Sequence, residues 1–529
     1  MKKALCDCLV RTGQVAAHCH SPSLLGFLCP SGFRYHLALP LHLDSGRFSS
    51  FRDPSIMLSK IFKAYDVRAV YPEPLSETAA WQVGCATGQF LKQQVADAGS
   101  PAAKLTLPNT VVMSRDMRPH SPQLTKAFTQ GIRAAGMDVI DVGMCDTSFI
   151  YFAINHLNCA GGVQVTASHN PIQYNGFKIS GAQARPIGAT TGLKQIEAIA
   201  ESLGEPGTVK GEGKFEERDL WEPYREHVLK FYQAPKAGRR PIKVVIDASN
   251  GMAGKLVPKV FAGLPGIEII PINFEITGAF SHDPNPLVAE NMKPTQQGVA
   301  KHRADLGACF DGDADRCILT DERGTIIGCD HLTAMLVEHF MKGQPKDTTI
   351  IYDLRSSKAL EEAIVANGAR PMKSRVGHVF MKALLRESQG VFGGELSGHF
   401  YFRDNFYADS GAIAFAAVLS MLGQSEKPLS QMIAPFKQYP QSGEINFHVD
   451  NKEKTLAAIE AKFGKGAIVD KLDGVTIDQW TGSGWWFNCR ASNTEPLIRL
   501  NAEAKDKAKL EGLLAELKPM LGTEDKGHH

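Results

Sequence analysis

One pattern occurs three times along the chain and limits the folds that this sequence can adopt. Each copy has an apolar strand, a polar loop, a helix that ends near a glycine, and a second strand; the copies cover residues 110–142, 243–270 and 349–373. Such intervals are too long for a solenoid but suit duplicated domains. Continuous β-branched strands that alternate with helices are typical of mixed, mainly parallel sheets with helices on both faces. The sequence therefore predicts three related α/β domains.

The last part of the chain has a different pattern and adds a fourth domain. Short strands at 444–449 and 485–489 precede an amphipathic helix near 505–520, which indicates a smaller α+β domain. A chain of 529 residues is several times longer than one hydrophobic core supports. Candidate linkers lie near 205–215 and 424–442. We expect the domains to span residues 57–215, 216–325, 326–438 and 439–529.

Residues 1–56 differ in composition from the rest of the chain. They hold four of the 11 cysteines and four histidines, but no glutamate. Two lysines begin the segment like a secretion signal, but charged residues interrupt the apolar region and no A-x-A cleavage site follows. A Cys-x-Cys pair and a His-Cys-His cluster leave a metal site open as an alternative. We interpret the segment as a leader or a mis-chosen start, with Met57 as the true first residue.

The charge balance argues against two classes of partner. The chain carries 58 basic and 56 acidic side chains, and a net charge of +2 gives no overall field for a nucleic acid or an anionic membrane. No stretch approaches 18 uninterrupted apolar residues, so we expect no membrane span. The cysteines lack C-x-x-C spacing and fit reduced thiols. We expect a cytoplasmic protein without an obligate protein partner, in which any basic site is local.

The first candidate for chemistry is Ser168, in a polar turn that follows an apolar strand. The segment Thr166–Pro171 reads TASHNP, and it places the Ser168 hydroxyl at the end of a strand, where sites in α/β proteins usually lie. Ser, Asn and Pro also form ordinary turns, so this motif alone is weak evidence. We expect Ser168 to be an exposed turn residue that contributes little to stability.

An acidic loop is the second candidate. Asp311, Asp313 and Asp315 occupy alternate positions after the apolar strand 306–310. In an extended strand they would lie roughly 6.6 Å apart, so the chain must curl at the small residues between them to bring their oxygens to one ion. Three carboxylates from one tight loop suit Mg²⁺.

The acidic loop also allows other interpretations. An EF-hand is disfavoured because Arg316 replaces the required glycine and the flanking elements are strands. A phosphatase that uses Asp311 as an aspartyl-phosphate nucleophile stays open as a minor alternative, although its motif usually continues with Thr or Val where Ala314 and Asp315 stand. A solvated acidic turn is less favoured, because the three acids follow a buried strand directly.

Two further motifs carry groups suited to a phosphorylated sugar. Glu395, Ser397 and His399 lie in GELSGH and offer an acceptor, a hydroxyl and a titratable ring, which suit vicinal sugar hydroxyls; a glycine-rich hairpin is the alternative. The segment 490–496 reads RASNTEP and is followed by Arg499. Such a turn can surround a phosphate with backbone N–H groups and arginine forks, or it can be an ordinary Ser/Thr turn.

Together and in this order, TASHNP, DGDADR, GELSGH and RASNTEP resemble the motifs of the α-D-phosphohexomutases, of the phosphomannomutase/phosphoglucomutase type. The resemblance extends from Met57 to the C-terminal helix. It implies an enzyme with four domains around a central cleft, with one motif from each domain and one Mg²⁺ per site.

The resemblance also implies roles for individual residues. The catalytic residues would be Ser168, as the phosphoserine, with Lys178, Arg316, His378, His399 and Arg68. The substrate would contact Tyr65, Lys373, Glu395, Ser397, Arg490, Ser492, Asn493, Thr494 and Arg499. The metal ligands would be Ser168, Asp311, Asp313 and Asp315. Either His378 or His399 could be an acid/base group or a structural histidine, and Ala69 stands where the motif around Arg68 usually has glycine.

The implied activity is the interconversion of hexose 6-phosphate and hexose 1-phosphate, of mannose and/or glucose, with a hexose 1,6-bisphosphate as intermediate and activator. Phosphoglucosamine mutase is the runner-up; Leu396, where a polar amide would favour an amino sugar, argues against it. A metal-dependent sugar phosphatase and a non-catalytic sugar-phosphate sensor are the alternatives from other classes.

Overall fold

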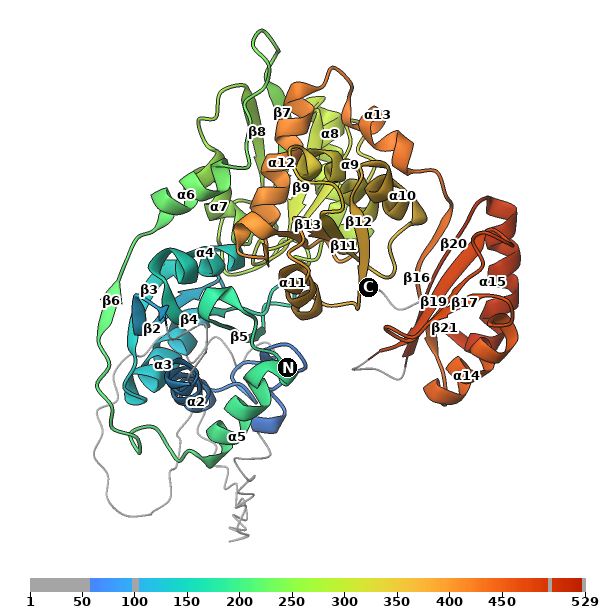
Figure 1. Cartoon of the computed structure of the whole chain (residues 1–529). Helices are drawn as coiled ribbons and strands as arrows, with labels where there is room; N and C mark the ends of the chain where they lie inside the picture. The colour runs from blue at the N-terminus through green and yellow to red at the C-terminus, as the bar shows by residue number, and fades with distance from the viewer. Residues whose placement is uncertain (1–57, 98–103, 493–496, 526–529) are drawn as a thin grey trace, which may run out of the picture. The chain divides into compact units, whose positions relative to one another are not determined.

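The computed structural model describes residues 58–97, 104–492 and 497–525, which contain four β-sheets (Figure 1). Three sheets are mixed and carry helices, and the fourth is antiparallel. The predicted fold class is therefore confirmed, and the strands and the helix expected in each of the three repeats form close to their expected bounds. The segment 1–56 lies outside the described residues.

The first domain is built around a six-stranded sheet in the order β1-β5-β4-β2-β3-β6. Its strands are β1 (Val67–Val70), β2 (Leu107–Arg115), β3 (Asp138–Met144), β4 (Cys159–Val165), β5 (Tyr174–Gly181) and β6 (Phe215–Glu217), and its helices are α2 (Glu77–Ala96), α3 (Ser121–Ala134), α4 (Thr147–Leu157) and α5 (Lys194–Ser202). Gly131 lets α3 pack closely on α2, because a Cβ there would lie 2.1 Å from the Trp81 carbonyl oxygen. The buried strand β4 brings the chain to Ser168 at its carboxyl end.

The second domain has a four-stranded sheet in the order β10-β9-β7-β8. The strands are β7 (Ile242–Asp247), β8 (Ile267–Ile272), β9 (Leu306–Phe310) and β10 (Cys317–Thr320), and the helices α6 (Trp221–Leu229), α7 (Ala253–Phe261) and α8 (Lys293–His302) accompany them. β9 and β10 pair antiparallel, with Phe310 opposite Cys317. The acidic loop is therefore the closed connection between two buried, paired strands.

The third domain has a five-stranded sheet in the order β12-β11-β13-β14-β15, in which β11 pairs parallel with β12 and β13 and the remaining pairs are antiparallel. The strands are β11 (Thr349–Asp353), β12 (Arg370–Ser374), β13 (Phe392–Gly394), β14 (Phe400–Phe402) and β15 (Ala408–Asp409), and the helices are α9 (Cys329–Met341), α10 (Lys358–Ala366), α11 (His378–Glu387), α12 (Gly411–Gln424) and α13 (Leu429–Ile433). The GELSGH motif spans the turn between β13 and β14.

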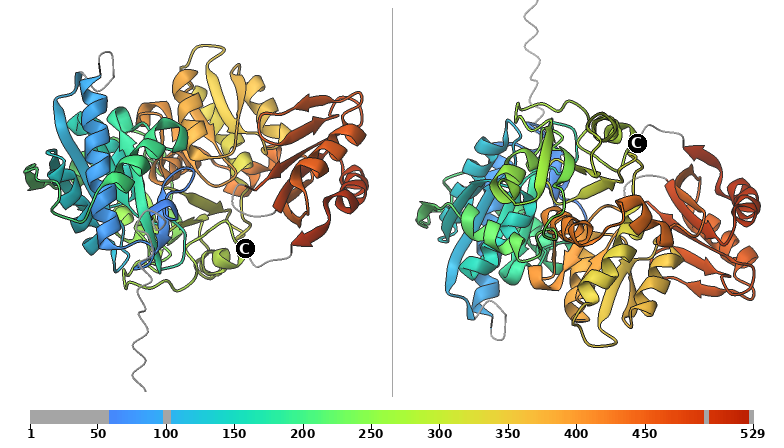
Figure 2. Two further views of the ribbon diagram at one scale, coloured as in Figure 1. Left: turned by 90° about the horizontal axis from the view of Figure 1, so that it is seen from below. Right: turned by 90° about the horizontal axis from the view of Figure 1, so that it is seen from above.

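The fourth domain has an antiparallel six-stranded sheet in the order β17-β18-β19-β20-β16-β21. The strands are β16 (Gln441–His448), β17 (Ile468–Asp470), β18 (Val475–Asp478), β19 (Trp485–Ala491), β20 (Leu497–Ala504) and β21 (Thr523–Asp525), with helices α14 (Lys452–Phe463) and α15 (Lys507–Leu521). Figures 1 and 2 show both helices on one side of this sheet. The other side carries the side chains of Glu444 in β16, Arg490 in β19 and Arg499 in β20.

The domains differ in whether they share a hydrophobic core. One apolar cluster joins α4 of the first domain to the sheets and helices of the second and third domains, whereas the fourth domain has a separate cluster around Phe447, Phe487 and Leu517. Polar contacts link the fourth domain to the third; Glu503 accepts from Lys358 N at 2.8 Å. No helix within the described ranges combines the length and apolar character needed to cross a membrane.

Candidate active site

The acidic loop brings its three carboxylates together. Asp311, Asp313 and Asp315 are buried, and an oxygen from each lies within 4.8 Å of the others. The chain curls between them at Ala314, which has a φ of +58°. Burial, and after it the charges of Asp315 and Asp313, raises the pKa of Asp311 well above its usual value. The loop thus concentrates negative charge that needs cations around it.

Ser168 lies against this loop. Its Oγ donates to Asp311 Oδ2 at 3.0 Å, and its backbone carbonyl accepts from Arg118 Nη2 at 2.8 Å. The expectation of an exposed turn is wrong, because the side chain is 1% exposed. Gly312 explains the burial: the backbones approach so closely that a Cβ on Gly312 would lie 2.5 Å from the Ser168 carbonyl oxygen. The hydroxyl is consequently fixed toward the carboxylates and not toward bulk solvent.

Arg118 holds the serine turn and was not recognised in the sequence. The buried guanidinium donates to the backbone carbonyls of Asn170 at 2.7 Å and Pro171 at 2.6 Å, in addition to that of Ser168. Its Nε pairs with Asp116 Oδ2 at 3.0 Å. The one sequence signal is the Asp116-x-Arg118 segment directly after β2, which is too common to be singled out.

Three cations surround the loop and the serine. Lys178 Nζ lies 2.8 Å from Asp313 Oδ2 and 2.6 Å from Asp315 Oδ2. Arg316 Nε lies 3.5 Å from Asp311 Oδ2, and Arg68 donates to Asn170 Oδ1 at 2.7 Å. Burial by itself lowers the pKa of Lys178, but the two carboxylates raise it above its usual value, so the lysine stays charged.

The loop also suits a metal ion. Asp313 Oδ1 is buried and has no hydrogen-bond partner among the described residues, although Asp313 Oδ2 is occupied by Lys178 and by Thr147 Oγ1 at 2.5 Å. An unsatisfied carboxylate oxygen in a buried, all-oxygen cluster fits a hard cation such as Mg²⁺.

The two candidate histidines differ in their surroundings. His399 Nδ1 lies 3.0 Å from Ser397 Oγ, and His399 Nε2 lies 3.4 Å from Asp315 Oδ1. The His378 ring stacks 6.2 Å from the His399 ring, and burial lowers the pKa of His378 well below its usual value. A third histidine has a closer contact with the serine: His169 Nδ1 lies 3.3 Å from Ser168 Oγ.

A cavity of about 850 Å³ extends from this region to the fourth domain. The predicted residues along it are Tyr65, Ser397, Arg490, Ser492 and Arg499, and His169 lines it beside Ser168. All four domains contribute to the lining. Glu395 is not among the lining residues, but the next two residues are. Its carboxylate accepts from Gly377 N at 2.9 Å and from Tyr401 Oη at 2.8 Å.

Some predicted substrate contacts are not among the cavity-lining residues. Lys373 points to Glu361, with 3.6 Å between Nζ and Oε2, whereas Arg375 lines the cavity two residues later. Arg375 comes directly after β12, which ends at Ser374. Asn493 and Thr494 lie outside the described residues.

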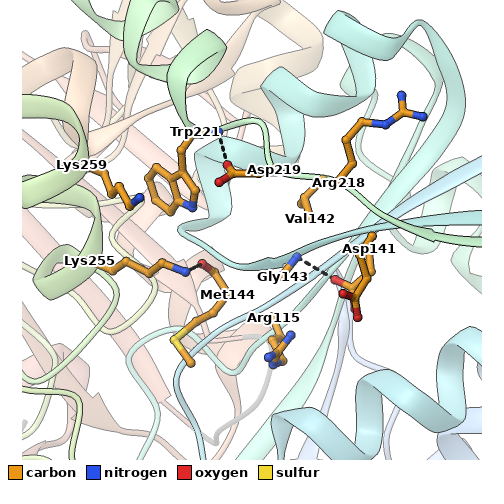
Figure 3. A pocket seen from close by; sticks show the side chains of 11 residues that line it. Arg115, Asp141, Val142, Gly143, Met144, Arg218, Asp219, Trp221, Lys255 and Lys259 are labelled. Carbon is orange, nitrogen blue, oxygen red and sulfur yellow. Dashed lines mark hydrogen bonds between the residues drawn. The ribbon is translucent and has the colours of Figure 1, made fainter.

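A second pocket of about 390 Å³ lies between the ends of β2 and β3 and helix α7 (Figure 3). Its lysine and arginine side chains include Lys255, whose Nζ donates to the Met144 carbonyl at 2.7 Å, and Arg218, which donates to Glu216. The lining contains no serine, threonine, cysteine or histidine. This pocket therefore lacks the hydroxyl and imidazole groups that line the larger cavity.

Models of one family match most of the chain. The phosphoglucomutase/phosphomannomutase alpha/beta/alpha domains I, II and III match residues 59–206, 222–324 and 329–439, and the C-terminal domain of that family matches residues 444–519.

Individual proteins are also similar to this chain. A phosphomannomutase from Escherichia coli strain K12 is 37% identical over 453 residues, 84% of this chain and 94% of that protein. Phosphohexose mutases from Xanthomonas campestris are 37% identical over 466 residues, 87% of this chain and 98% of theirs. A crystal structure of a phosphoglucomutase/phosphomannomutase family protein from Burkholderia thailandensis superposes with a TM-score of 0.77 at 31% identity, over 87% of this chain and 96% of that one.

Proposed function

Because the chain belongs to the phosphoglucomutase/phosphomannomutase family and is an isomerase of that type, we propose that it interconverts hexose 6-phosphate and hexose 1-phosphate through a phosphoserine at Ser168. The observation that carries this proposal is the position of the Ser168 hydroxyl, 3.0 Å from Asp311 Oδ2 in a buried cluster with Lys178 and Arg316. Phosphoryl transfer depends mainly on alignment and charge neutralisation, and these residues supply both.

Each side chain of the cluster has a distinct task in this proposal. Phosphorylated Ser168 transfers its phosphoryl group to the free hydroxyl of a hexose monophosphate, and the hexose 1,6-bisphosphate returns its other phosphoryl group to Ser168 after it turns around. Lys178 and Arg316 neutralise charge on the group in transit. Asp311, Asp313 and Asp315, with an oxygen of phosphorylated Ser168, would hold Mg²⁺. When bound, the ion would neutralise charge on the transferring phosphoryl oxygens.

The rest of the cavity positions the sugar. Ser397, with Glu395 behind it, is placed to read hydroxyls, and His399 lies nearer to the acidic loop than His378 does and is better placed to contact the reacting hydroxyl. Arg490, Arg499 and Ser492 form the subsite for the phosphate that is not reacting, which we call the distal-phosphate subsite. Tyr65 and Arg375 line the space between the two ends.

Intact-mass measurement together with a coupled mutase assay tests this proposal. We expect a stable phosphate on Ser168 and conversion of glucose 1-phosphate to glucose 6-phosphate. An acid-stable phosphoserine separates the mutase from a phosphatase that uses Asp311, since an acyl phosphate is labile. Release of inorganic phosphate as the main product would support the phosphatase, and binding without turnover would support a sensor.

We further predict that glucose 1-phosphate and mannose 1-phosphate are both substrates, with kcat/KM values within about two orders of magnitude of each other. These sugars differ only at carbon 2, and a site that reads the other hydroxyls leaves no buried polar group unsatisfied by either sugar. Glucosamine 1-phosphate should be clearly poorer. A side-by-side rate comparison checks this, and a preference for glucosamine 1-phosphate would replace the assignment with phosphoglucosamine mutase.

A further inference from the structure

The two arginines of the distal-phosphate subsite share one carboxylate. Glu444, in β16, accepts from Arg490 Nη2 at 2.7 Å through Oε2 and from Arg499 Nη1 at 3.0 Å through Oε1. Arg490 and Arg499 are register partners in β19 and β20, and Glu444 is opposite Asn501 in the neighbouring strand pair. The three side chains therefore lie on one face of the sheet, the face that α14 and α15 leave uncovered.

A third arginine reaches the same carboxylate from the third domain. Arg355 Nη1 lies 3.2 Å from Glu444 Oε2, and Arg355 Nη2 pairs with Asp353 Oδ2 at 2.9 Å. Asp353 Oδ2 also accepts from Leu396 N at 2.7 Å, in the loop that carries Ser397. Glu444 thus connects the distal-phosphate subsite to the sugar-reading loop through one arginine.

The charges explain why an anion is needed at this position. Like charges directly opposite each other in paired strands are destabilising, and Arg490 is almost fully buried, with no partner for its Nε in the part of the chain that the structure describes. Burial opposes the ionisation of Glu444, but Arg490, Arg355 and Arg499 together lower its pKa to about 2, so the carboxylate is charged at any pH near neutrality. Glu444 thus places a negative charge against the same three arginines that a bound phosphate would contact.

We propose that Glu444 is a permanent counter-ion in the distal-phosphate subsite. Its carboxylate holds Arg490, Arg499 and Arg355 in place and lowers their affinity for the substrate phosphate. The inference rests on the proposed mutase function, in which the bisphosphate must leave this subsite, turn around and bind again. A phosphate dianion that shares its arginines with a carboxylate binds less tightly than one that has them alone. Glu444 therefore keeps the affinity of the subsite for phosphate low. Tight binding there would slow the release of the bisphosphate and with it the catalytic cycle.

The substitution Glu444→Gln tests this, because it removes the charge and keeps the shape of the side chain. We expect the Kd for glucose 1-phosphate, measured by calorimetry, to fall by about tenfold. KM should fall with it, and kcat should fall as well, because the bisphosphate is released more slowly. The matched control is Glu460→Gln, which removes a charge from α14 of the same domain, where Glu460 pairs with Lys471 at 2.8 Å. This control should bind glucose 1-phosphate as the wild type does.

Unchanged or weaker binding of glucose 1-phosphate by Glu444→Gln would overturn the inference, since a glutamate that only organises the arginines would weaken binding when its charge is removed. If Glu444→Gln does not fold, Glu444→Asp gives the second test. The shorter side chain keeps the charge but moves it away from the arginines. The affinity for glucose 1-phosphate should therefore be higher than that of the wild type by about twofold to threefold. Weaker binding would again overturn the inference. The binding measurement does not need turnover, so it separates this inference from a failure of the mutase assignment.

Discussion

Replacement of Ser168 with alanine should lower mutase turnover by about four orders of magnitude, because the proposed phosphoryl carrier is lost and no other side chain takes its place. The fold should persist. The variant loses the hydrogen bonds of Ser168 Oγ with Asp311 Oδ2 and with His169 Nδ1, which contribute about 1 kcal/mol each. We therefore expect the melting midpoint to fall by a few degrees at most. A coupled assay and a thermal melt check the two parts, and intact mass should show that the phosphate is absent.

A matched control for this variant is Ser202→Ala, at the end of α5, where Oγ donates to the Ile199 carbonyl. It should keep both turnover and phosphate content. Near-normal turnover of Ser168→Ala would contradict the phosphoserine assignment and would leave Asp311 as the remaining candidate nucleophile. Loss of turnover together with a large fall in the melting midpoint would instead indicate that the buried serine is required for folding.

Removal of divalent metal should abolish turnover, and Mg²⁺ should restore it. Asp313→Asn should raise the Mg²⁺ concentration needed for half-maximal activity by at least about tenfold, because one anionic ligand becomes neutral while its shape is kept. The metal-free variant should be as stable as the metal-free wild type or more so, since Asp313 contributes to the charge that raises the pKa of Asp311. Magnesium titration of activity and paired thermal melts measure these effects.

Asp305→Asn serves as the control for this variant, since Asp305 lies in the same domain but pairs with Arg240 at the surface. Its response to Mg²⁺ should match the wild type. Full activity of the protein after treatment with a chelator would contradict a catalytic metal. A strong loss of stability in metal-free Asp313→Asn would show that the carboxylate is needed for its pairing with Lys178, at 2.8 Å, and not for an ion.

Local sequence patterns predicted the features that depend on neighbouring residues. The apolar strands and amphipathic helices of the three repeats have periods that reflect which face is buried, so their positions follow from the sequence alone. The curl of the acidic loop also follows, because three carboxylates at alternate positions need a backbone turn before they converge. Ala314 makes that turn with a positive φ.

The contacts between the domains depended on the tertiary structure. Lys178 pairs with Asp313 and Asp315, which come from another domain, and nothing in either segment specifies which lysine reaches which acid. The burial of Ser168 follows from the approach of Gly312 across the same boundary. Neighbouring residues alone would have left that serine exposed.

The difference between Lys373 and Arg375 and the role of Glu444 also depend on the tertiary structure. In the sequence Lys373 and Arg375 are equally good partners for a phosphate, and only the folded structure shows that Arg375 lines the cavity. Glu444 has no motif, because its role comes from three arginines contributed by two other strands and another domain. The elements and the chemical groups can be predicted from the sequence, since both depend on local periodicity and residue type. Which charges meet depends on the packing of the domains, because it brings together residues that no local pattern connects.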